Sequence, residues 1–109
     1  KSPYKNQIKI FQGEANTTLE QLKIKSYDFV FIDADKQNYC EYYKRSMKLL
    51  KPGGIIVLDN MLWSGSVINP KDLDAQALAN TADYIKDDQR VYNFLVPIRD
   101  GLMVCIKHE

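Results

Sequence analysis

The stretch that decides the fold reads Tyr27-Asp28-Phe29-Val30-Phe31-Ile32-Asp33-Ala34-Asp35-Lys36. Its first six residues are nearly all apolar, as expected for a strand that is covered on both faces of a sheet. A second apolar run at residues 55–58 leads directly into Asp59 and Asn60. The sequence therefore predicts two strands that each end in a carboxylate.

A helix is predicted between these two strands. Aromatic and apolar side chains recur over residues 38–50 at the spacing of one helix face, and they are Tyr39, Tyr43, Met47 and Leu50. The turn Pro52-Gly53-Gly54 then ends the helix and leads into the second strand. Strand, helix and strand form one β-α-β crossover, so the two strands are parallel and their carboxyl ends lie at the same edge of the sheet.

The flanking sequence extends this pattern. Residues 8–11 are a short strand candidate, and a helix capped by Asn16 or Thr17 is expected to run through residues 19–24, with Glu20 as a capping-box partner. Residues 61–70 are irregular, a helix covers residues 73–85, and residues 91–96 and 102–106 form an antiparallel hairpin. We therefore predict an α/β fold with a mainly parallel sheet and a C-terminal antiparallel hairpin.

Composition narrows the functional classes. The chain has 109 residues, enough for one domain, and its net charge is +1 with Lys and Arg scattered along it. This distribution argues against a nucleic-acid or anionic-membrane partner. No stretch is long and apolar enough to cross a membrane, and no signal peptide is visible. With Cys40 and Cys105 as free thiols, a cytoplasmic protein is the simplest interpretation.

The polar residues at the two strand ends suggest a metal site. Asp33, Asp59 and Asn60 would converge at one edge of the sheet, where open α/β sheets bind ligands, with Lys36 beside them. Such an oxygen-only donor set suits Mg²⁺, Mn²⁺ or Ca²⁺ and argues against Zn²⁺. The alternative is that these aspartates only cap the segments that follow the strands.

Two motifs together resemble one enzyme family. Residues 27–39 and residues 58–67, the latter reading Leu58-Asp59-Asn60-Met61-Leu62-Trp63-Ser64-Gly65-Ser66-Val67, are similar to the cation-dependent O-methyltransferases of the caffeoyl-CoA type. Catechol O-methyltransferase is a more distant relative. The resemblance implies a partial Rossmann-like class I methyltransferase sheet. The first two strands of that fold and its Gly-rich cofactor loop are absent, so residues 1–109 are expected to be the C-terminal portion of a single methyltransferase domain.

The resemblance also implies roles for individual residues. Asp33, Asp59 and Asn60 match the metal ligands, and Lys36, assisted by Asp33, matches the catalytic base. The positions matching contacts to S-adenosylmethionine are Ala15, Asp35 and Tyr42. The positions matching the acceptor pocket are Trp63 and Ser64. On composition alone, Lys36 could instead be a surface lysine paired with Asp35, Tyr39 and Tyr42 could be helix packing residues, and Trp63 could pack in a satellite cluster.

These roles predict a divalent-cation-dependent methyl transfer from S-adenosylmethionine to a hydroxyl of a catechol-like or caffeoyl-type acceptor. Bound Mg²⁺ (or Mn²⁺ or Ca²⁺) would activate and orient a small hydroxylated aromatic substrate. Because the cofactor loop is absent, we expect the isolated chain to bind S-adenosylmethionine weakly or not at all and to be inactive.

The missing strands also raise a question of assembly. Residues 8–11 could pair with residues 27–32 in a compact five-stranded sheet, or two chains could pair edge to edge as a homodimer, or a partner could supply the absent half. A non-catalytic binding or assembly module is therefore an alternative. A phosphorylatable receiver-like domain is disfavoured, because residues 10–13 offer no acidic pair and residues 95–98 offer no lysine.

Overall fold

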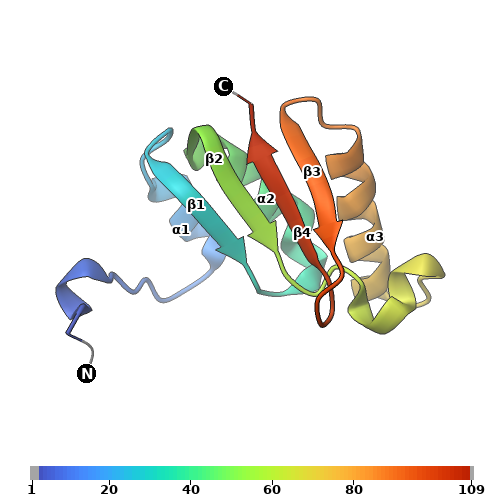
Figure 1. Cartoon of the computed structure of the whole chain (residues 1–109). Helices are drawn as coiled ribbons and strands as arrows, with labels where there is room; N and C mark the ends of the chain where they lie inside the picture. The colour runs from blue at the N-terminus through green and yellow to red at the C-terminus, as the bar shows by residue number, and fades with distance from the viewer. Residues whose placement is uncertain (1–2, 109) are drawn as a thin grey trace.

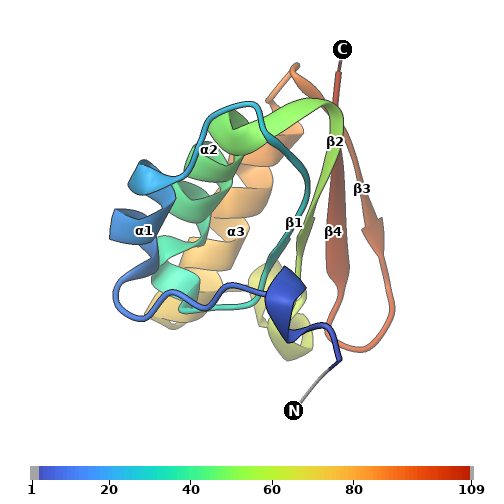
Figure 2. The ribbon, with the colours of Figure 1, turned by 90° about the vertical axis from the view of Figure 1, so that its left-hand side faces the viewer.

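The computed structural model describes residues 3–108, apart from the side chain of Ser64. Four strands form one sheet in the order β1-β2-β4-β3, and three helices cover one face of it (Figures 1 and 2). The strands are β1 (Tyr27–Ile32), β2 (Leu50–Leu58), β3 (Val91–Val96) and β4 (Leu102–Lys107). The helices are α1 (Ala15–Gln21), α2 (Tyr39–Leu49) and α3 (Leu73–Lys86), with short 3-10 turns η1 (Lys5–Gln7), η2 (Lys36–Asn38) and η3 (Trp63–Ile68).

The predicted β-α-β crossover is confirmed. Strands β1 and β2 are parallel and α2 connects them, with Ile32 opposite Leu58 at their carboxyl ends. The prediction that Pro52-Gly53-Gly54 is a turn before the strand is wrong, because β2 already begins at Leu50. A register shift in the pairing accommodates these residues, and Gly53 adopts a φ of 82° that favours glycine.

The α/β fold and the C-terminal hairpin are also confirmed, but the sheet is mixed rather than mainly parallel. Strands β3 and β4 pair antiparallel from Val91–Lys107 to Val96–Leu102. Strand β4 then inserts between β3 and β2 and runs antiparallel to both. Among the described strands, the β1–β2 pairing alone is parallel, because the short link from β3 to β4 returns the chain in the opposite direction beside β2.

The N-terminal region differs from the prediction. Residues 8–11 form no strand, and Ile10 is 83% exposed in an extended arm that leads away from the sheet (Figure 1). A strand needs a neighbouring strand to satisfy its main-chain hydrogen-bonding groups. Residues 8–11 have no such neighbour, and no described segment pairs with the outer edge of β1. Helix α1 begins at Ala15 after Glu14 as N-cap, so the predicted Asn16 or Thr17 cap is wrong, and the helix ends before Leu22.

The hydrophobic core lies between the helices and the sheet. The stripe of Tyr39, Tyr43 and Met47 on α2 is fully or almost fully buried, as its spacing predicts. These side chains pack against Ile56 and Leu58 of β2, and burial of each large apolar side chain contributes about 1.5–3 kcal/mol. The core thus fixes α2 over the parallel pair and sets the position of both strand ends.

The opposite face of the sheet is apolar and uncovered in the part of the chain described here (Figure 2). Two cross-strand rows occupy it. The rows are Phe29-Ile55-Ile106-Tyr92 and Phe31-Val57-Val104-Phe94. The four aromatic side chains at the ends of these rows are each about half exposed or more. Exposed apolar patches of this kind are typical of interaction surfaces.

Two further observations concern membrane and redox chemistry. Within residues 3–108, no helix has the length and apolar character that crossing a bilayer requires. Cys40 and Cys105 are free thiols, as predicted, and burial raises the pKa of the Cys105 thiol to about 12. Neither thiol is therefore activated by its surroundings.

An ion pair anchors the start of β3 to α2. Both Asp88 carboxylate oxygens accept hydrogen bonds from the Arg90 guanidinium, at 2.9 and 2.8 Å, and the Tyr43 hydroxyl donates another at 2.8 Å. The Arg90 bonds, followed by those from the Arg90 main chain and Tyr43, lower the pKa of Asp88 from 3.8 to about 2 against the opposing effect of burial. The carboxylate is thus stabilised in the folded state.

This ion pair predicts a pH dependence of stability. Because the folded-state pKa of Asp88 is below its unfolded value, its contribution is present above pH 3.8 and is lost as the pH falls toward 2. We expect Asp88→Asn to lower the free energy of unfolding at pH 7 and to lose most of that difference by pH 2, measured by urea unfolding. Asp87→Asn, at the exposed neighbouring position, removes the same charge and serves as control. An Asp88→Asn deficit that is equal at both pH values would contradict the prediction.

Candidate active site

The two strand ends that carry the predicted metal ligands lie side by side. Ile32 pairs with Leu58, and the Asp59 amide donates a hydrogen bond to the Ile32 carbonyl at 3.0 Å. Asp33 and Asp59 therefore follow directly from paired positions at one edge of the sheet. The parallel register, set by the buried side chains of both strands, is the physical reason for this juxtaposition.

Lys36 is held close to these strand ends. Its ammonium nitrogen donates to the Ala34 carbonyl at 2.7 Å and to the Tyr39 hydroxyl at 3.1 Å, and it lies 3.5 Å from Asp33 Oδ1. Only 10% of the Lys36 side chain is exposed. The alternative in which Lys36 is a surface lysine paired with Asp35 is thus not what the structure has, since its carboxylate partner is Asp33.

Two aromatic rings enclose the Lys36 ammonium. The nitrogen lies 4.7 Å from the centroid of the Tyr39 ring and 5.6 Å from the centroid of the Trp63 ring. Both distances are within the range of cation–π attraction. The lysine on η2 is therefore fixed between the start of α2 and the loop that follows β2.

The candidate cation ligands differ in their exposure and in their hydrogen bonds. The Asp33 side chain is 53% exposed, whereas Asp59 Oδ1 accepts a hydrogen bond from the Asn60 amide at 2.7 Å. Within residues 3–108, no group of three or more His, Cys, Asp or Glu side chains is gathered in a way that could hold a metal. The predicted set contains two carboxylates and one amide, and these oxygen donors match the chemistry of a hard divalent cation.

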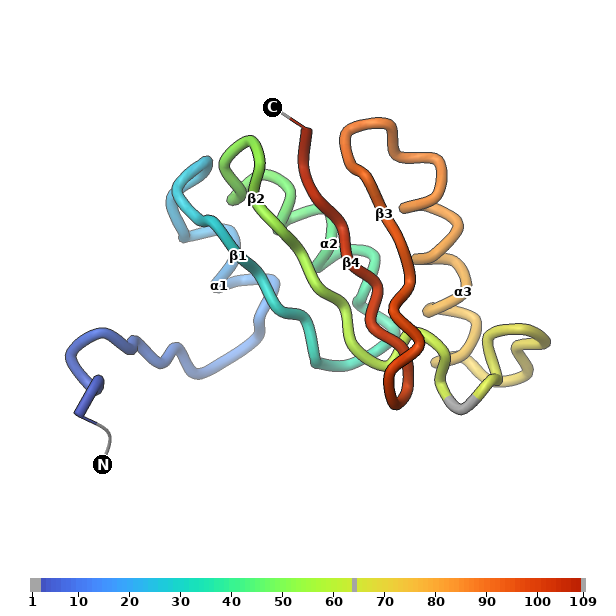
Figure 3. The backbone as a smooth tube through the Cα atoms, viewed as in Figure 1, coloured from blue at the N-terminus to red at the C-terminus, as the bar shows by residue number. Residues whose placement is uncertain are grey.

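The loop after β2 is pinned by the turn between β3 and β4 (Figure 3). The Met61 amide donates to the Gly101 carbonyl at 3.1 Å, and the Leu62 amide donates to the Asp100 carbonyl at 2.8 Å. Asn60 itself has a φ of 64°, a left-handed conformation that asparagine tolerates better than most residues. The position of Asn60 and Trp63 thus depends on a contact with the C-terminal hairpin.

Two of the predicted cofactor contacts, Asp35 and Tyr42, are hydrogen-bonded to each other. The Tyr42 hydroxyl donates to Asp35 Oδ1, and the Asn38 side-chain amide donates to Asp35 Oδ2. The Tyr42 bond, followed by the Asn38 bond, lowers the pKa of Asp35 below its usual value. Burial, with Asp35 as a second cause, raises the pKa of Tyr42 to about 12. Asp35 is therefore an oriented carboxylate that accepts hydrogen bonds.

A hollow of about 410 Å³ brings all three predicted cofactor residues together. Its lining residues come from the start of α1, from η2 and from α2, and they are Gly13, Glu14, Ala15, Asn16, Asp35, Asn38 and Tyr42. Ala15 is separated from Asp35 and Tyr42 in sequence, so only the packing of α1 against α2 places it here. The hollow is polar, and its lining includes the carboxylates of Glu14 and Asp35.

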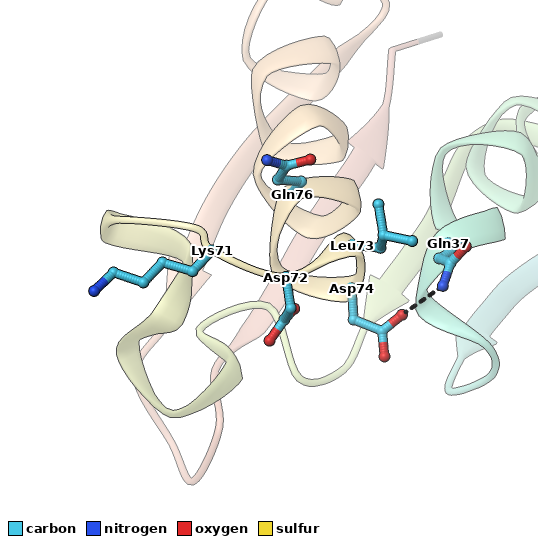
Figure 4. Close-up of a pocket in the computed structure, with 6 residues that line it drawn as sticks. All are labelled: Gln37, Lys71, Asp72, Leu73, Asp74 and Gln76. Carbon is cyan, nitrogen blue, oxygen red and sulfur yellow. Dashed lines mark hydrogen bonds between the residues drawn. The ribbon is translucent and has the colours of Figure 1, made fainter.

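A second hollow, of about 570 Å³, adjoins the first through Asp35 and Asn38. Lys36 and Trp63 line it, together with Gln37 and Asp74. A third hollow of about 630 Å³ continues from Gln37 and Asp74 along the start of α3 (Figure 4). Gln37 and Asp74 line both of these hollows, and the Gln37 side-chain amide donates to Asp74 Oδ1 at 3.3 Å. Ser64, the other predicted acceptor residue, lies outside the described side chains.

Sequence reasoning missed two residues of this site. Asn38 orients Asp35, and its position three residues after this predicted cofactor contact could have indicated its role. The spacing on α2 favours a packing role for Tyr39, but its buried hydroxyl also contacts Lys36 and the main chain of both strand ends. No local pattern distinguishes such a tyrosine from Tyr43, which belongs to the same stripe.

The fold and the site define a class of protein. A parallel strand pair with acidic residues at its carboxyl edge, next to adjoining hollows, is the arrangement with which open α/β sheets bind ligands. The chain belongs to the O-methyltransferase family, whose sequence model matches residues 1–108. This result confirms the resemblance of the two motifs.

Individual relatives agree with this assignment. The chain is 37% identical to caffeoyl-CoA O-methyltransferase 1 of Eucalyptus globulus, over 92% of this chain and 46% of the relative. Among solved structures, a putative caffeoyl-CoA O-methyltransferase from Staphylococcus aureus is 26% identical, with a TM-score of 0.85 over 95% of this chain and 53% of that one. An O-methyltransferase from Bacillus cereus in complex with SAH is 30% identical, with a TM-score of 0.72 over 85% and 46%. The chain spans about half the length of these relatives.

Proposed function

We propose that the chain carries the catalytic and cation-binding half of an O-methyltransferase that transfers a methyl group from S-adenosylmethionine to a hydroxyl of a small aromatic acceptor. The observation that carries the proposal is the juxtaposition of Asp33 and Asp59 at paired strand ends, with Lys36 held within 3.5 Å of Asp33. The names of the relatives, which are caffeoyl-CoA O-methyltransferases, support a phenolic acceptor with vicinal oxygens.

In this proposal Lys36 is the proton acceptor. Methyl transfer is an in-line displacement that needs an anionic acceptor oxygen placed next to the methyl group. Lys36 lies between the strand ends and Trp63, where the acceptor hydroxyl would lie. To accept this proton, Lys36 must first release one of its own ammonium protons to solvent and become a neutral amine. Its contacts with Ala34, Asp33 and Tyr39 hold the nitrogen in place for the transfer.

A divalent cation would be held by Asp33, Asp59 and Asn60. We favour Mg²⁺ as this cation, ahead of Mn²⁺ or Ca²⁺. A cation bound there would lower the pKa of an acceptor hydroxyl and orient two vicinal oxygens. Asp33 contributes an accessible carboxylate, and Asp59 is fixed by its hydrogen bond from Asn60. The oxygen-only chemistry of these side chains supports the assignment.

Asp35, Tyr42 and Ala15 would bind S-adenosylmethionine in the polar hollow beside α1. The Asp35 carboxylate accepts hydrogen bonds, which suits cofactor hydroxyl groups, and Tyr42 and Asn38 keep it oriented. The SAH in the Bacillus cereus structure is the demethylated product of this cofactor, which supports the choice. Trp63 and Ser64 would line the acceptor side, where a planar ring can stack on the indole.

We further propose that residues 1–109 are the C-terminal portion of a single domain. Three features support this: the free edge of β1, the uncovered apolar face of the sheet and the length of the relatives. The rest of the domain would cover that face and complete the cofactor site. The homodimer that the sequence suggested is a separate prediction. The same uncovered face favours the alternative of an assembly module, which catalytic turnover by this chain alone would contradict.

The proposal predicts a cation affinity that depends on Asp33. We expect Asp33→Asn to weaken Mn²⁺ binding by about 100-fold, at or beyond the upper end of the loss seen when an outer-shell partner is removed. Isothermal titration calorimetry with Mn²⁺ measures this. Asp28→Asn is the matched control, because Asp28 is at the other end of β1, is exposed and is paired with Lys51 at 3.4 Å. Equal Mn²⁺ affinities for Asp33→Asn and the unchanged chain would contradict the proposal.

A further inference from the structure

We infer that Tyr39 is a positioning residue, whose buried hydroxyl joins Lys36 to the ends of β1 and β2 in one hydrogen-bonded unit. The unit is a property of the structure itself. Its consequence for cation binding and methyl transfer rests on the proposed function. Tyr39 contacts no candidate ligand through that ligand's side chain, so it would act on the site through Lys36 and the main chain.

The contacts of the hydroxyl carry the inference. Tyr39 is the first residue of α2 and is completely buried. Its oxygen accepts a hydrogen bond from Lys36 Nζ at 3.1 Å. It also lies 2.9 Å from the Asp59 carbonyl and 3.2 Å from the Ile32 carbonyl, which share its single proton. One buried atom therefore links η2, β1 and β2 at the point where the candidate ligands begin.

These links constrain the residues proposed to do the chemistry. The Ile32 carbonyl belongs to the peptide that leads into Asp33, and the Asp59 carbonyl belongs to the peptide that leads into Asn60. Neighbouring strand ends are free to splay once the ladder ends, and the Asp59 amide already holds the Ile32 carbonyl there at 3.0 Å. A hydroxyl that contacts both carbonyls limits this freedom. Catalytic side chains and metal ligands must be held within about 0.5 Å of their working positions, and contacts of this kind hold them there.

The ring and the hydroxyl of Tyr39 have separable roles. The ring packs in the core and lies 4.7 Å from Lys36 Nζ, and a phenylalanine would keep both contacts. Only the hydroxyl connects to the strand ends. Tyr39→Phe therefore removes the proposed linkage while leaving the packing of α2 unchanged, which makes it a specific probe.

Tyr43 provides a matched control one helical turn later. It has the same residue type on the same helix, and it is also completely buried. Its hydroxyl donates to Asp88 at 2.8 Å, at a position remote from the strand ends. Tyr43→Phe thus removes a buried tyrosine hydroxyl with its hydrogen bond but touches neither Lys36 nor a candidate ligand.

The test uses two readouts on the chain and on both variants. The first is the exchange of the Lys36 ammonium protons with water, followed by NMR of ¹⁵N-labelled lysine. We expect Tyr39→Phe to speed this exchange by about tenfold, because one of the hydrogen-bond acceptors of the ammonium is lost. The second is Mn²⁺ affinity by calorimetry, which we expect to fall by about 10–100-fold in Tyr39→Phe, as for other outer-shell partners. Tyr43→Phe should change neither readout.

The outcomes separate this inference from the proposed function. Faster Lys36 exchange and weaker Mn²⁺ binding in Tyr39→Phe alone support both. Unchanged exchange in Tyr39→Phe, or equal changes in Tyr43→Phe, overturns the positioning role whatever Mn²⁺ does. Faster exchange in a chain that binds no Mn²⁺ supports the hydrogen-bonded unit and overturns the cation site. Retention of the fold is checked by circular dichroism for each variant.

Discussion

Replacement of Lys36 by methionine is expected to lower kcat for methyl transfer by about 10²–10⁴-fold in the complete domain proposed above, the usual contribution of a positioned general base. Methionine keeps an unbranched apolar stem that can still pack between the rings of Tyr39 and Trp63. It removes the nitrogen that would accept the acceptor proton, together with the contacts of that nitrogen with Ala34, Asp33 and Tyr39. The measurement is a single-turnover rate with saturating S-adenosylmethionine and a catechol acceptor.

Two variants sharpen the interpretation of this result. Lys44→Met makes the same change on α2, where the lysine lies 4.8 Å from the Tyr84 ring and away from the site, and we expect no effect on kcat. Lys36→Arg keeps the charge but should not restore the rate, since a guanidinium cannot give up its proton in a protein. A Lys36→Met rate within threefold of the unchanged protein would remove Lys36 from the catalytic role.

Sequence reasoning succeeded where the signal was local and periodic. The apolar run of β1 and the two apolar runs of the hairpin are nearly continuous in the sequence, and the tyrosine stripe of α2 has the spacing of one helix face. Once a parallel crossover is inferred, the convergence of Asp33 and Asp59 follows from chain geometry alone. These few patterns were enough to predict the α/β fold, whereas the family followed from the resemblance of residues 27–39 and 58–67 to known O-methyltransferases.

Features that depend on distant partners could not be predicted in this way. Residues 8–11 have the composition of a strand, but no described segment pairs with them. The residues at Pro52-Gly53-Gly54 look like a turn, yet pairing of Leu50 with Tyr27 extends the strand through them. The hydrogen-bond partners of Lys36 and Asp35 depend on the 3-10 turn η2, and no hydrophobic periodicity in the sequence predicts this turn. Local composition therefore indicated which residues form the site, whereas tertiary contacts decided how they are oriented.

The C-terminal hairpin is one such distant partner, and it leads to a second strong prediction. We expect Gly101→Ala to lower the free energy of unfolding by about 2–6 kcal/mol, the sum of backbone strain and overpacking. Gly101 has a φ of 86°, which disfavours any residue with a Cβ atom. An added Cβ would also lie 2.6 Å from Leu62 Cγ and 3.2 Å from the Leu62 main-chain nitrogen.

Gly53→Ala separates the two contributions to this loss. Gly53 has nearly the same φ, 82°, but no atom lies within 4 Å of a Cβ placed there, so only the strain of about 1–3 kcal/mol applies. Urea unfolding of both variants measures the difference. If Gly101→Ala is no less stable than Gly53→Ala, the close packing of the hairpin turn against Leu62 does not stabilise the fold.

The loss at Gly101 should also reach the candidate site. The Gly101 carbonyl accepts the Met61 amide at 3.1 Å, so a displaced turn would move the loop that begins with Asn60. We therefore expect Gly101→Ala to weaken Mn²⁺ binding by about 10-fold or more, as for other supporting contacts, whereas Gly53→Ala should not. Equal Mn²⁺ affinity in the two variants would show that the ligand loop keeps its position without the hairpin. A difference would make β4 and its turn part of the support of the site, since they then set the position of Asn60 and Trp63 from outside the strands that carry the carboxylates.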